Sequence, residues 1–194
     1  MSTPSLLALL ARTAALCESC DVPYMVMGGI AVAVHAIPRP TLDVDLTIDA
    51  EDERLQRLLR AAVDEGFVVP ERHLAGFTDT LKGMGKLQLT AFVEDLEHDV
   101  DLFLVTTEYQ RAAFERRRQA DLGAGRYWVI APEDLVLHKL LTGRGRDESD
   151  VDDVLFLQGG ALDLAHLREW AERLDLVSVL ERKLRTVQGE ERSP

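Results

Sequence analysis

The sequence lacks long apolar runs, is poor in aromatic residues and contains only two cysteines. Aromatic residues make up 6% of its 194 residues. No apolar run reaches the ~18 to 20 residues that are needed to cross a bilayer. The apolar start, residues 1–15, is interrupted by Arg12 and has no basic segment before it, unlike a signal peptide. These absences predict a cytoplasmic protein that does not associate with membranes.

Basic residues are also scarce. Lys and Arg number 22 against 34 Asp and Glu, which gives a formal net charge of −12. Proteins that bind nucleic acid broadly use clustered Lys and Arg to neutralise phosphates, so this balance argues against such binding. It suits a protein whose acids hold metal ions or attract a cationic substrate, and it leaves room for a local basic patch at residues 116–118.

The cysteines, Cys17 and Cys20, have the C-x-x-C spacing of redox and zinc sites. No second Cys/His pair completes a zinc site, and the pair ends an amphipathic run with apolar residues at positions 6, 7, 10 and 14. We therefore interpret both cysteines as buried thiols at a helix end.

Apolar periodicity divides the chain into an α/β part, residues 1–130, and a helical C-terminal part, residues 131–194. Strands are expected at 24–27, 42–48, 86–93, 98–105 and 126–130. Helices are expected at 4–20, 30–36, 51–65, 108–119, 132–141, 147–158, 162–173 and 176–187, with Asp49 and Asp147 as N-caps. Residues 67–84 read as irregular, and 188–194 as a polar tail. The fold class is thus mixed α/β (α+β), a small mixed sheet flanked by helices, with a helical C-terminal region.

Two Asp-x-Asp pairs fall within predicted strands. Asp43 and Asp45 share one face of their strand because side chains alternate along it, and Asp99 and Asp101 do the same in theirs. Two like charges side by side cost stability unless a cation neutralises them. If the two strands are neighbours, Asp99 or Asp101 adds a third carboxylate, as a two-metal phosphoryl-transfer site requires.

A glycine pair, Gly28 and Gly29, lies where a short apolar strand meets a predicted helix. Glycine allows the backbone to approach a phosphate closely, and the first turn of a helix supplies free N–H donors. The pair is therefore a candidate phosphate-binding turn, although glycine pairs are common in turns without a ligand.

These motifs resemble the signature of the minimal nucleotidyltransferases of the DNA polymerase β superfamily. The resemblance is carried by Met27-Gly28-Gly29-Ile30-Ala31-Val32 and then Arg39-Pro40-Thr41-Leu42-Asp43-Val44-Asp45-Leu46, with thirteen residues between Gly29 and Asp43. A later segment, Ala131-Pro132-Glu133-Asp134-Leu135 through Lys139-Leu140, Arg146-Asp147 and Asp150 to Asp153, is similar to AbiEii-type toxin nucleotidyltransferases. The first motif is also similar to small antibiotic nucleotidyltransferases.

The resemblance implies Mg²⁺-dependent transfer of a nucleoside monophosphate from an NTP to an acceptor hydroxyl. It implies that Asp43, Asp45 and Asp101 ligate Mg²⁺, and that Asp101 helps to deprotonate the acceptor. Gly28, Gly29 and Lys139 would contact phosphates, with Arg39 and Thr41 as further nucleotide-binding candidates. Arg39 could instead pair with Asp43. Gly29 stands where many members carry Ser, which removes one hydroxyl from the phosphate site.

The acceptor is less specified than the reaction. The preferred interpretation is a toxin-type enzyme that modifies tRNA, another RNA or a protein and is restrained by a cognate antitoxin. An antibiotic nucleotidyltransferase acting on an aminoglycoside or a lincosamide is the alternative among enzymes. A catalytically silent nucleotide- or partner-binding module is the alternative from another class.

Overall fold

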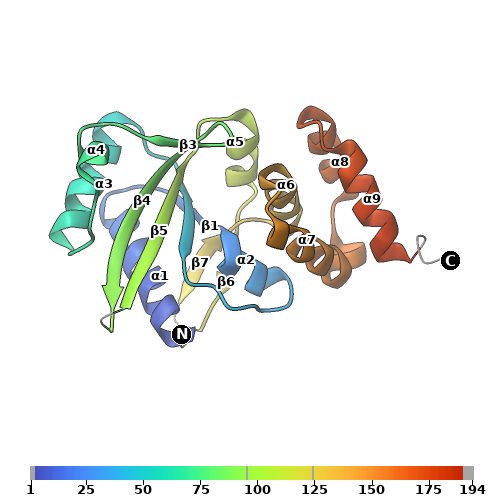
Figure 1. Cartoon of the computed structure of the whole chain (residues 1–194), viewed down its shortest axis with the longest axis horizontal. Coiled ribbons are helices and arrows are strands. Elements are labelled where there is room, and N and C mark those ends of the chain that lie inside the picture. The colour runs from blue at the N-terminus through green and yellow to red at the C-terminus, as the bar shows by residue number, and fades with distance from the viewer. Residues whose placement is uncertain (1–2, 95, 124, 190–194) are drawn as a thin grey trace. The chain divides into compact units, whose positions relative to one another are not determined.

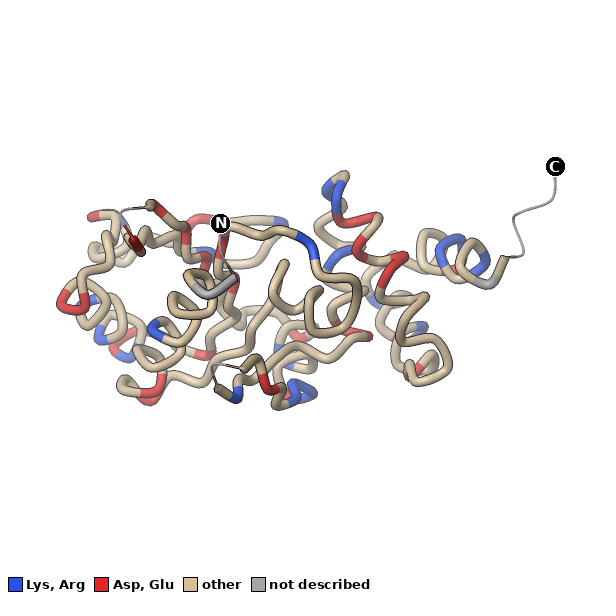
Figure 2. Tube along the Cα trace, turned by 90° about the horizontal axis from the view of Figure 1, so that it is seen from below, with Lys and Arg blue, Asp and Glu red and all other residues tan. Residues whose placement is uncertain are grey.

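The computed structural model describes residues 3–94, 96–123 and 125–189 and forms two compact units (Figure 1). The first unit comprises residues 1–30 and 40–130, and the second comprises residues 31–39 and 131–194. Residues 190–194, most of the predicted polar tail, lie outside the described part. Acidic residues are interspersed with basic ones along the trace of each unit (Figure 2).

The first unit is built on a mixed seven-stranded sheet with the order β3-β4-β5-β2-β1-β7-β6. The β2–β5 and β1–β7 pairs are parallel, and the remaining pairs are antiparallel. The predicted mixed sheet is therefore confirmed, and the two strands expected at 86–93 and 98–105 form an antiparallel hairpin, β4–β5. The strands are β1 (Tyr24–Val26), β2 (Val44–Ile48), β3 (Asp79–Leu81), β4 (Met84–Val93), β5 (Leu96–Leu104), β6 (Arg118–Asp121) and β7 (Arg126–Val129).

Helices α1 (Thr3–Ser19), α3 (Asp52–Asp64), α4 (Glu71–Leu74) and α5 (Glu108–Glu115) belong to the same unit. Helix α1 packs against β2, β4 and α3, and its Leu9 and Leu10 are completely buried. Cys17 and Cys20 are free and buried, as predicted. Burial, together with the nearby Cys20 and Glu18, raises the pKa of Cys17 to about 12, so this thiol stays protonated and unreactive.

The second unit consists mainly of helices α6 (Pro132–Thr142), α7 (Gly145–Gln158), α8 (Leu164–Arg173) and α9 (Val177–Gln188), with the short 3-10 helix η1 (Gly159–Ala161). Helix α6 packs against α7 and α8, and α9 packs against α7 and α8. Pro132 occupies the first turn of α6, as its sequence predicts. Within the described residues, no helix has both the length and the apolar character that crossing a bilayer requires.

Several predicted boundaries in the first unit are wrong. Helix α3 begins at Asp52 after Glu51, so Asp49 does not cap it, and the Asp49 carboxylate faces Arg111 at 3.9 Å. Helix α5 ends at Glu115, because the following residues enter the edge strand β6. The basic run 116–118 is therefore a turn and a strand start, not a helix face. The segment predicted as irregular contains α4 and β3.

Two predicted helix starts also need correction. Helix α2 (Gly28–His35) includes both glycines in its first turn instead of following them. Helix α7 begins at Gly145 with Arg144 as N-cap, which makes Asp147 the third residue of the helix. The Asp147 carboxylate nevertheless accepts the Arg144 backbone N–H at 3.1 Å, so it satisfies a free donor of the first turn from inside the helix.

Candidate active site

The two Asp-bearing strands are neighbours, as the carboxylate pattern required. Strands β2 and β5 are parallel, with Asp45 paired to Asp101 and Leu46 to Leu102. Paired residues of adjacent strands share a face of the sheet, so Asp101, and not Asp99, lies beside Asp45. Strand β2 begins only at Val44, which places Asp43 immediately before the strand and corrects its predicted position within it.

Asp101 is held on one side and open on the other. The Lys86 ammonium of β4 contacts its Oδ2 at 2.7 Å, whereas Oδ1 is buried and has no hydrogen-bond partner among the residues that the structure describes. Burial raises the pKa of Asp101; the Lys86 ammonium opposes this rise, and the charges of Asp99 and Asp43 add to it. An unpaired buried oxygen is costly, and this one lies on the strand next to Asp45, where a ligand or a proton could satisfy it.

The glycine pair is fixed by what lies against it. Gly28 has φ +58, and a Cβ there would come within 1.8 Å of Oδ2 of Asp45. A Cβ on Gly29 would come within 2.5 Å of the Thr41 hydroxyl oxygen. The Met27 backbone N–H also donates to the Asp45 carbonyl at 2.8 Å. The first turn of α2, the Thr41 hydroxyl and the Asp45 carboxylate therefore form one closely packed group.

Arg39 and Lys139 meet in a different place, within the second unit. The Arg39 guanidinium binds Asp150 through two nitrogens, at 2.6 and 2.8 Å. The Lys139 ammonium donates to Asp150 at 2.7 Å and to Asp147 at 2.8 Å. Arg39 thus has Asp150 as a carboxylate partner, where the sequence suggested Asp43. The four side chains form a compact network that joins the segment after α2 to α6 and α7.

The network is buried and electrically balanced. The side chains of Lys139 and Asp150 are 7% and 2% exposed. Although burial acts in the opposite direction, hydrogen bonds from Arg39 and Lys139 hold the pKa of Asp150 below its usual value. Hydrogen bonds from Lys139 and Thr142 likewise lower the pKa of Asp147 against the effect of burial. Both carboxylates are therefore ionised at neutral pH.

The residues around Asp45 and Asp101 suit a hard divalent cation. Carboxylate oxygens are the preferred ligands of Mg²⁺, and the buried, unpaired Oδ1 of Asp101 lies on the face that carries Asp45. Among residues 3–94, 96–123 and 125–189, no three or more His, Cys, Asp or Glu side chains lie close enough together to hold a metal ion by themselves. The donor chemistry fits the ion, and substrate oxygens or waters would complete its coordination.

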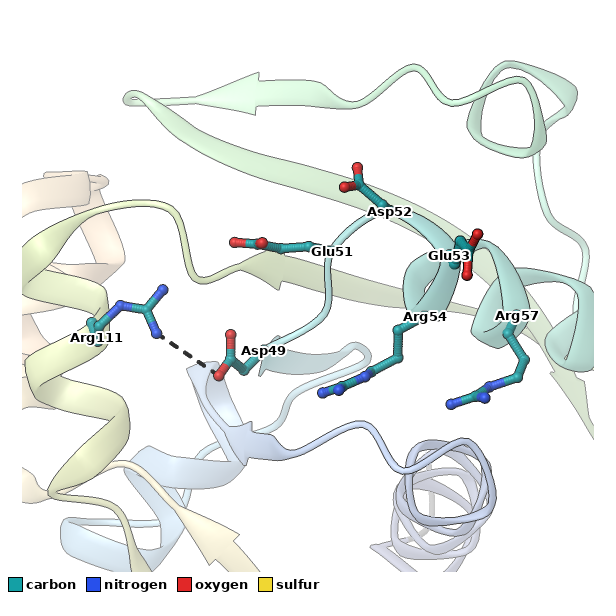
Figure 3. Close-up of a pocket in the computed structure, with 7 residues that line it drawn as sticks. All are labelled: Asp49, Glu51, Asp52, Glu53, Arg54, Arg57 and Arg111. Atoms are coloured by element: carbon teal, nitrogen blue, oxygen red, sulfur yellow. Dashed lines mark ion pairs between the residues drawn. The ribbon is translucent and has the colours of Figure 1, made fainter.

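A polar hollow lies beyond the C-terminal end of β2 (Figure 3). Asp49 follows the last residue of β2, and Arg54 and Arg111 extend toward it from α3 and α5 in Figure 3. Arg57 is occupied by the Cys20 carbonyl at 2.7 Å. The remaining lining residues are the acids Glu51, Asp52 and Glu53. None of the predicted site residues lines this hollow, so it is separate from the Asp45 group.

The sequence analysis did not identify Lys86 as the partner of Asp101, or Asp150 as the partner of Arg39 and Lys139. Lys86 alternates with apolar residues on its strand, and it pairs across the hairpin with Phe103, two residues from Asp101 on the same face. The sequence did contain a signal for Lys86: it is a basic residue on the polar side of the strand that precedes the Asp99–Asp101 strand. It becomes usable only when the hairpin register is known.

A family model identifies the chain as a nucleotidyltransferase. The chain belongs to a family described as "Nucleotidyltransferase of unknown function (DUF6036)", whose model matches residues 5–188. A comparison with curated proteins finds no match. The family confirms the predicted resemblance to nucleotidyltransferases, whereas the superfamily and the AbiEii-type subgroup stay predictions.

Solved structures share the fold at low sequence identity. An antigenic nucleotidyltransferase-like protein from Paracoccidioides brasiliensis is 19% identical, with 93% of this chain and 94% of that chain covered and a TM-score of 0.55. The antibiotic-resistance factor ANT(2'')-Ia in solution is 13% identical, with 97% and 98% covered and a TM-score of 0.61. ANT(2'')-Ia in complex with adenylyl-2''-tobramycin is 15% identical, with 87% and 97% covered and a TM-score of 0.55.

Proposed function

We propose that this protein is a divalent-cation-dependent enzyme that transfers a nucleoside monophosphate from an NTP to an acceptor hydroxyl. One observation carries the proposal: Asp45 and Asp101 lie side by side on β2 and β5, and Asp45 packs against the glycine turn that opens α2. An anion-binding helix start and a carboxylate pair are the two parts that phosphoryl transfer needs in proximity.

The chain's own residues would act as follows. The Gly28 and Gly29 backbone and the Thr41 hydroxyl bind triphosphate oxygens, with the hydroxyl lying against the space where a side chain at position 29 would begin. Oδ1 of Asp101 accepts the proton of the attacking hydroxyl, because it is the oxygen without a partner. The hydroxyl oxygen attacks the α-phosphorus, and the bond to the leaving pyrophosphate breaks.

Asp45 and Asp101, which lie side by side, would hold a divalent cation, Mg²⁺ in the first instance, with Asp43 as the predicted third ligand. When bound, such an ion neutralises charge on the phosphates and favours the alkoxide form of the acceptor. Arg39 and Lys139 remain predicted nucleotide contacts. Both cations are bound to Asp150, so a phosphate would have to share or displace that carboxylate.

Two acceptor classes have support. A cationic, hydroxyl-bearing small molecule such as an aminoglycoside is favoured by the net charge of −12 and by the likeness to ANT(2'')-Ia, which was solved with adenylyl-2''-tobramycin. An RNA or protein acceptor, with a cognate antitoxin as partner and a cytoplasmic location, is favoured by the Lys139 segment. We place the small molecule first, because the overall charge opposes RNA phosphates.

The proposal is tested by incubating the protein with α-labelled NTPs, Mg²⁺ and three acceptor pools: aminoglycosides and lincosamides, total RNA, and protein extract. Label in one pool identifies the acceptor class. Asp45→Asn should lower incorporation by about 10³-fold or more while leaving the protein folded, as a cooperative thermal transition would show. No incorporation by the wild type, together with no Mg-NTP binding in calorimetry, would show that the enzyme hypothesis is wrong.

The choice between Asp99 and Asp101 has its own matched pair of variants. Asp101→Asn should lower kcat about as strongly as Asp45→Asn, because it replaces the oxygen proposed to receive the proton. Asp99→Asn removes the same charge from the same strand and should change kcat by only about 10-fold or less. The opposite ranking would move the third carboxylate to Asp99.

A further inference from the structure

Lys86 is a cation inside a group of carboxylates that would otherwise repel one another. Its ammonium lies 2.7 Å from Oδ2 of Asp101, and the two side chains are only 19% and 13% exposed. The charges of Asp99 and Asp43 also act on Asp101. Like charges this close oppose ionisation and folding unless an opposite charge is present.

The Lys86 ammonium contacts only one of the two carboxylate oxygens of Asp101. Lys86 pairs with Phe103 across the β4–β5 hairpin, so it approaches Asp101 diagonally from the neighbouring strand. It contacts Oδ2 and leaves Oδ1 without a partner. The ammonium also lies 5.9 Å from the centre of the Phe103 ring, which helps to fix its position. One oxygen of Asp101 is therefore occupied, and the other is free.

We propose that Lys86 is an internal counter-ion and a positioning residue of the active site. It neutralises part of the carboxylate charge before a divalent cation binds, and it fixes the rotamer of Asp101 so that Oδ1 stays free. This inference rests on the proposed function, because it assigns Lys86 a role in that same site. It gives Lys86 no contact with the nucleotide.

A counter-ion has two effects of opposite sign. Because the ammonium repels an incoming cation, removing it should make divalent cations bind more tightly. Because the ammonium also orients Asp101, removing it should slow turnover. A lysine with a purely structural role would change neither cation affinity nor the free oxygen, and a lysine that binds phosphate would change the KM for the NTP.

The experiment compares the full-length wild type with Lys86→Met, Lys86→Arg and the control Lys82→Met, which alters an exposed lysine in the β3–β4 turn. Melting temperatures are measured with chelator and then across titrations of Mn²⁺ and Mg²⁺ alone. Without cation, Lys86→Met should melt on the order of 5 °C below the wild type. Its midpoint concentration for Mn²⁺ stabilisation should fall about 3- to 10-fold.

Turnover gives the second readout. Lys86→Met should lower kcat about 10- to 100-fold with little change in the KM for the NTP. Lys86→Arg, which keeps the charge, should recover most of the turnover and the wild-type Mn²⁺ midpoint, and Lys82→Met should behave as the wild type. If Lys86→Met does not fold in chelator, addition of Mn²⁺ should restore its folding, since the cation replaces the missing charge.

Three results would overturn the inference. They are an Mn²⁺ midpoint that is unchanged or higher in Lys86→Met, a raised KM for the NTP at unchanged kcat, and a misfolded Lys86→Met that Mn²⁺ does not rescue. Failure of the proposed function has a different signature: the wild type itself would show neither a cation-dependent melting shift nor incorporation of label.

Discussion

Two clusters of buried charged side chains differ in how completely their carboxylate oxygens are hydrogen-bonded. In the second unit, Arg39 and Lys139 face Asp147 and Asp150, two cations against two carboxylates. All four carboxylate oxygens accept hydrogen bonds, including one from the Thr142 hydroxyl. In the first unit, Lys86 holds one oxygen of Asp101 while the other oxygen is buried without a partner.

This difference indicates two roles. The fully hydrogen-bonded network stabilises the fold, whereas the cluster with an unpaired oxygen is suited to binding a ligand. A buried ion network holds its elements together when each group is satisfied, and it offers nothing to a ligand without first being broken. A cluster with excess negative charge and an open oxygen is costly by itself and gains when a cation arrives. Both clusters contain a lysine bound to an aspartate, but of these two it is the Lys86 cluster that leaves a carboxylate oxygen without a partner among the described residues.

Lys139→Met is the strongest test of the closed network. It would leave two buried carboxylates with one cation between them, and breaking such a network costs about 3–5 kcal/mol. Urea denaturation should show this loss in the free energy of unfolding, and Lys82→Met, at an exposed position, should not. If Lys139→Met kept its stability and instead raised the KM for the NTP, the lysine would be the phosphate contact that the family resemblance implies.

The sequence predicted elements better than it predicted partners. The alternation around Asp45 identified a strand with an acidic face, and the apolar period of residues 132–141 identified α6, because both depend on local spacing alone. The family resemblance predicts Lys139 as a phosphate contact, whereas in the structure its ammonium binds Asp150 on the next helix. Which residues meet depends on helix packing, which local spacing does not contain.

The prediction of the site residues was limited in the same way, because the sequence does not give the register between strands. The pairing of β2 with β5 could be hypothesised from two acidic strands, but the choice of Asp101 over Asp99 needed the register, since a shift of two residues keeps the same face. Lys86 could not be assigned to the site for the same reason, because its approach to Asp101 depends on the register of β4 against β5. The glycine pair was found by its spacing, while the contacts of Gly28 with Asp45 and Gly29 with Thr41 were not.

The closed network should also make the second unit sensitive to acid through His138. Burial, together with the adjacent Lys139 charge, lowers the pKa of His138 to about 4 from 6.5. The folded state thus holds the neutral imidazole. Its contribution to stability is present above pH 6.5 and is lost as the pH falls toward 4, because the unfolded chain takes up the proton first. The shift corresponds to about 3 kcal/mol.

His138→Gln removes this titration and provides the measurement. Urea denaturation at intervals between pH 7.5 and pH 4.5 should show a steeper loss of stability in the wild type than in His138→Gln. Parallel curves for the two proteins would mean that His138 is not the acid-sensitive group.

The smallest expected effect concerns the packing of Gly29 against Thr41, in the turn beside Asp45. A Cβ at position 29 would lie 2.5 Å from the Thr41 hydroxyl oxygen and 2.6 Å from its Cβ, so Gly29→Ala should cost about 1–3 kcal/mol of stability through overpacking. In a Thr41→Gly background that cost should nearly vanish, and the double-mutant cycle measures the coupling directly. Gly145→Ala is the matched control, since a Cβ there meets nothing within 4 Å. If Gly29→Ala cost no more than Gly145→Ala, the turn beside Asp45 would be loosely packed, and the binding of phosphate there would depend on ordering by the ligand.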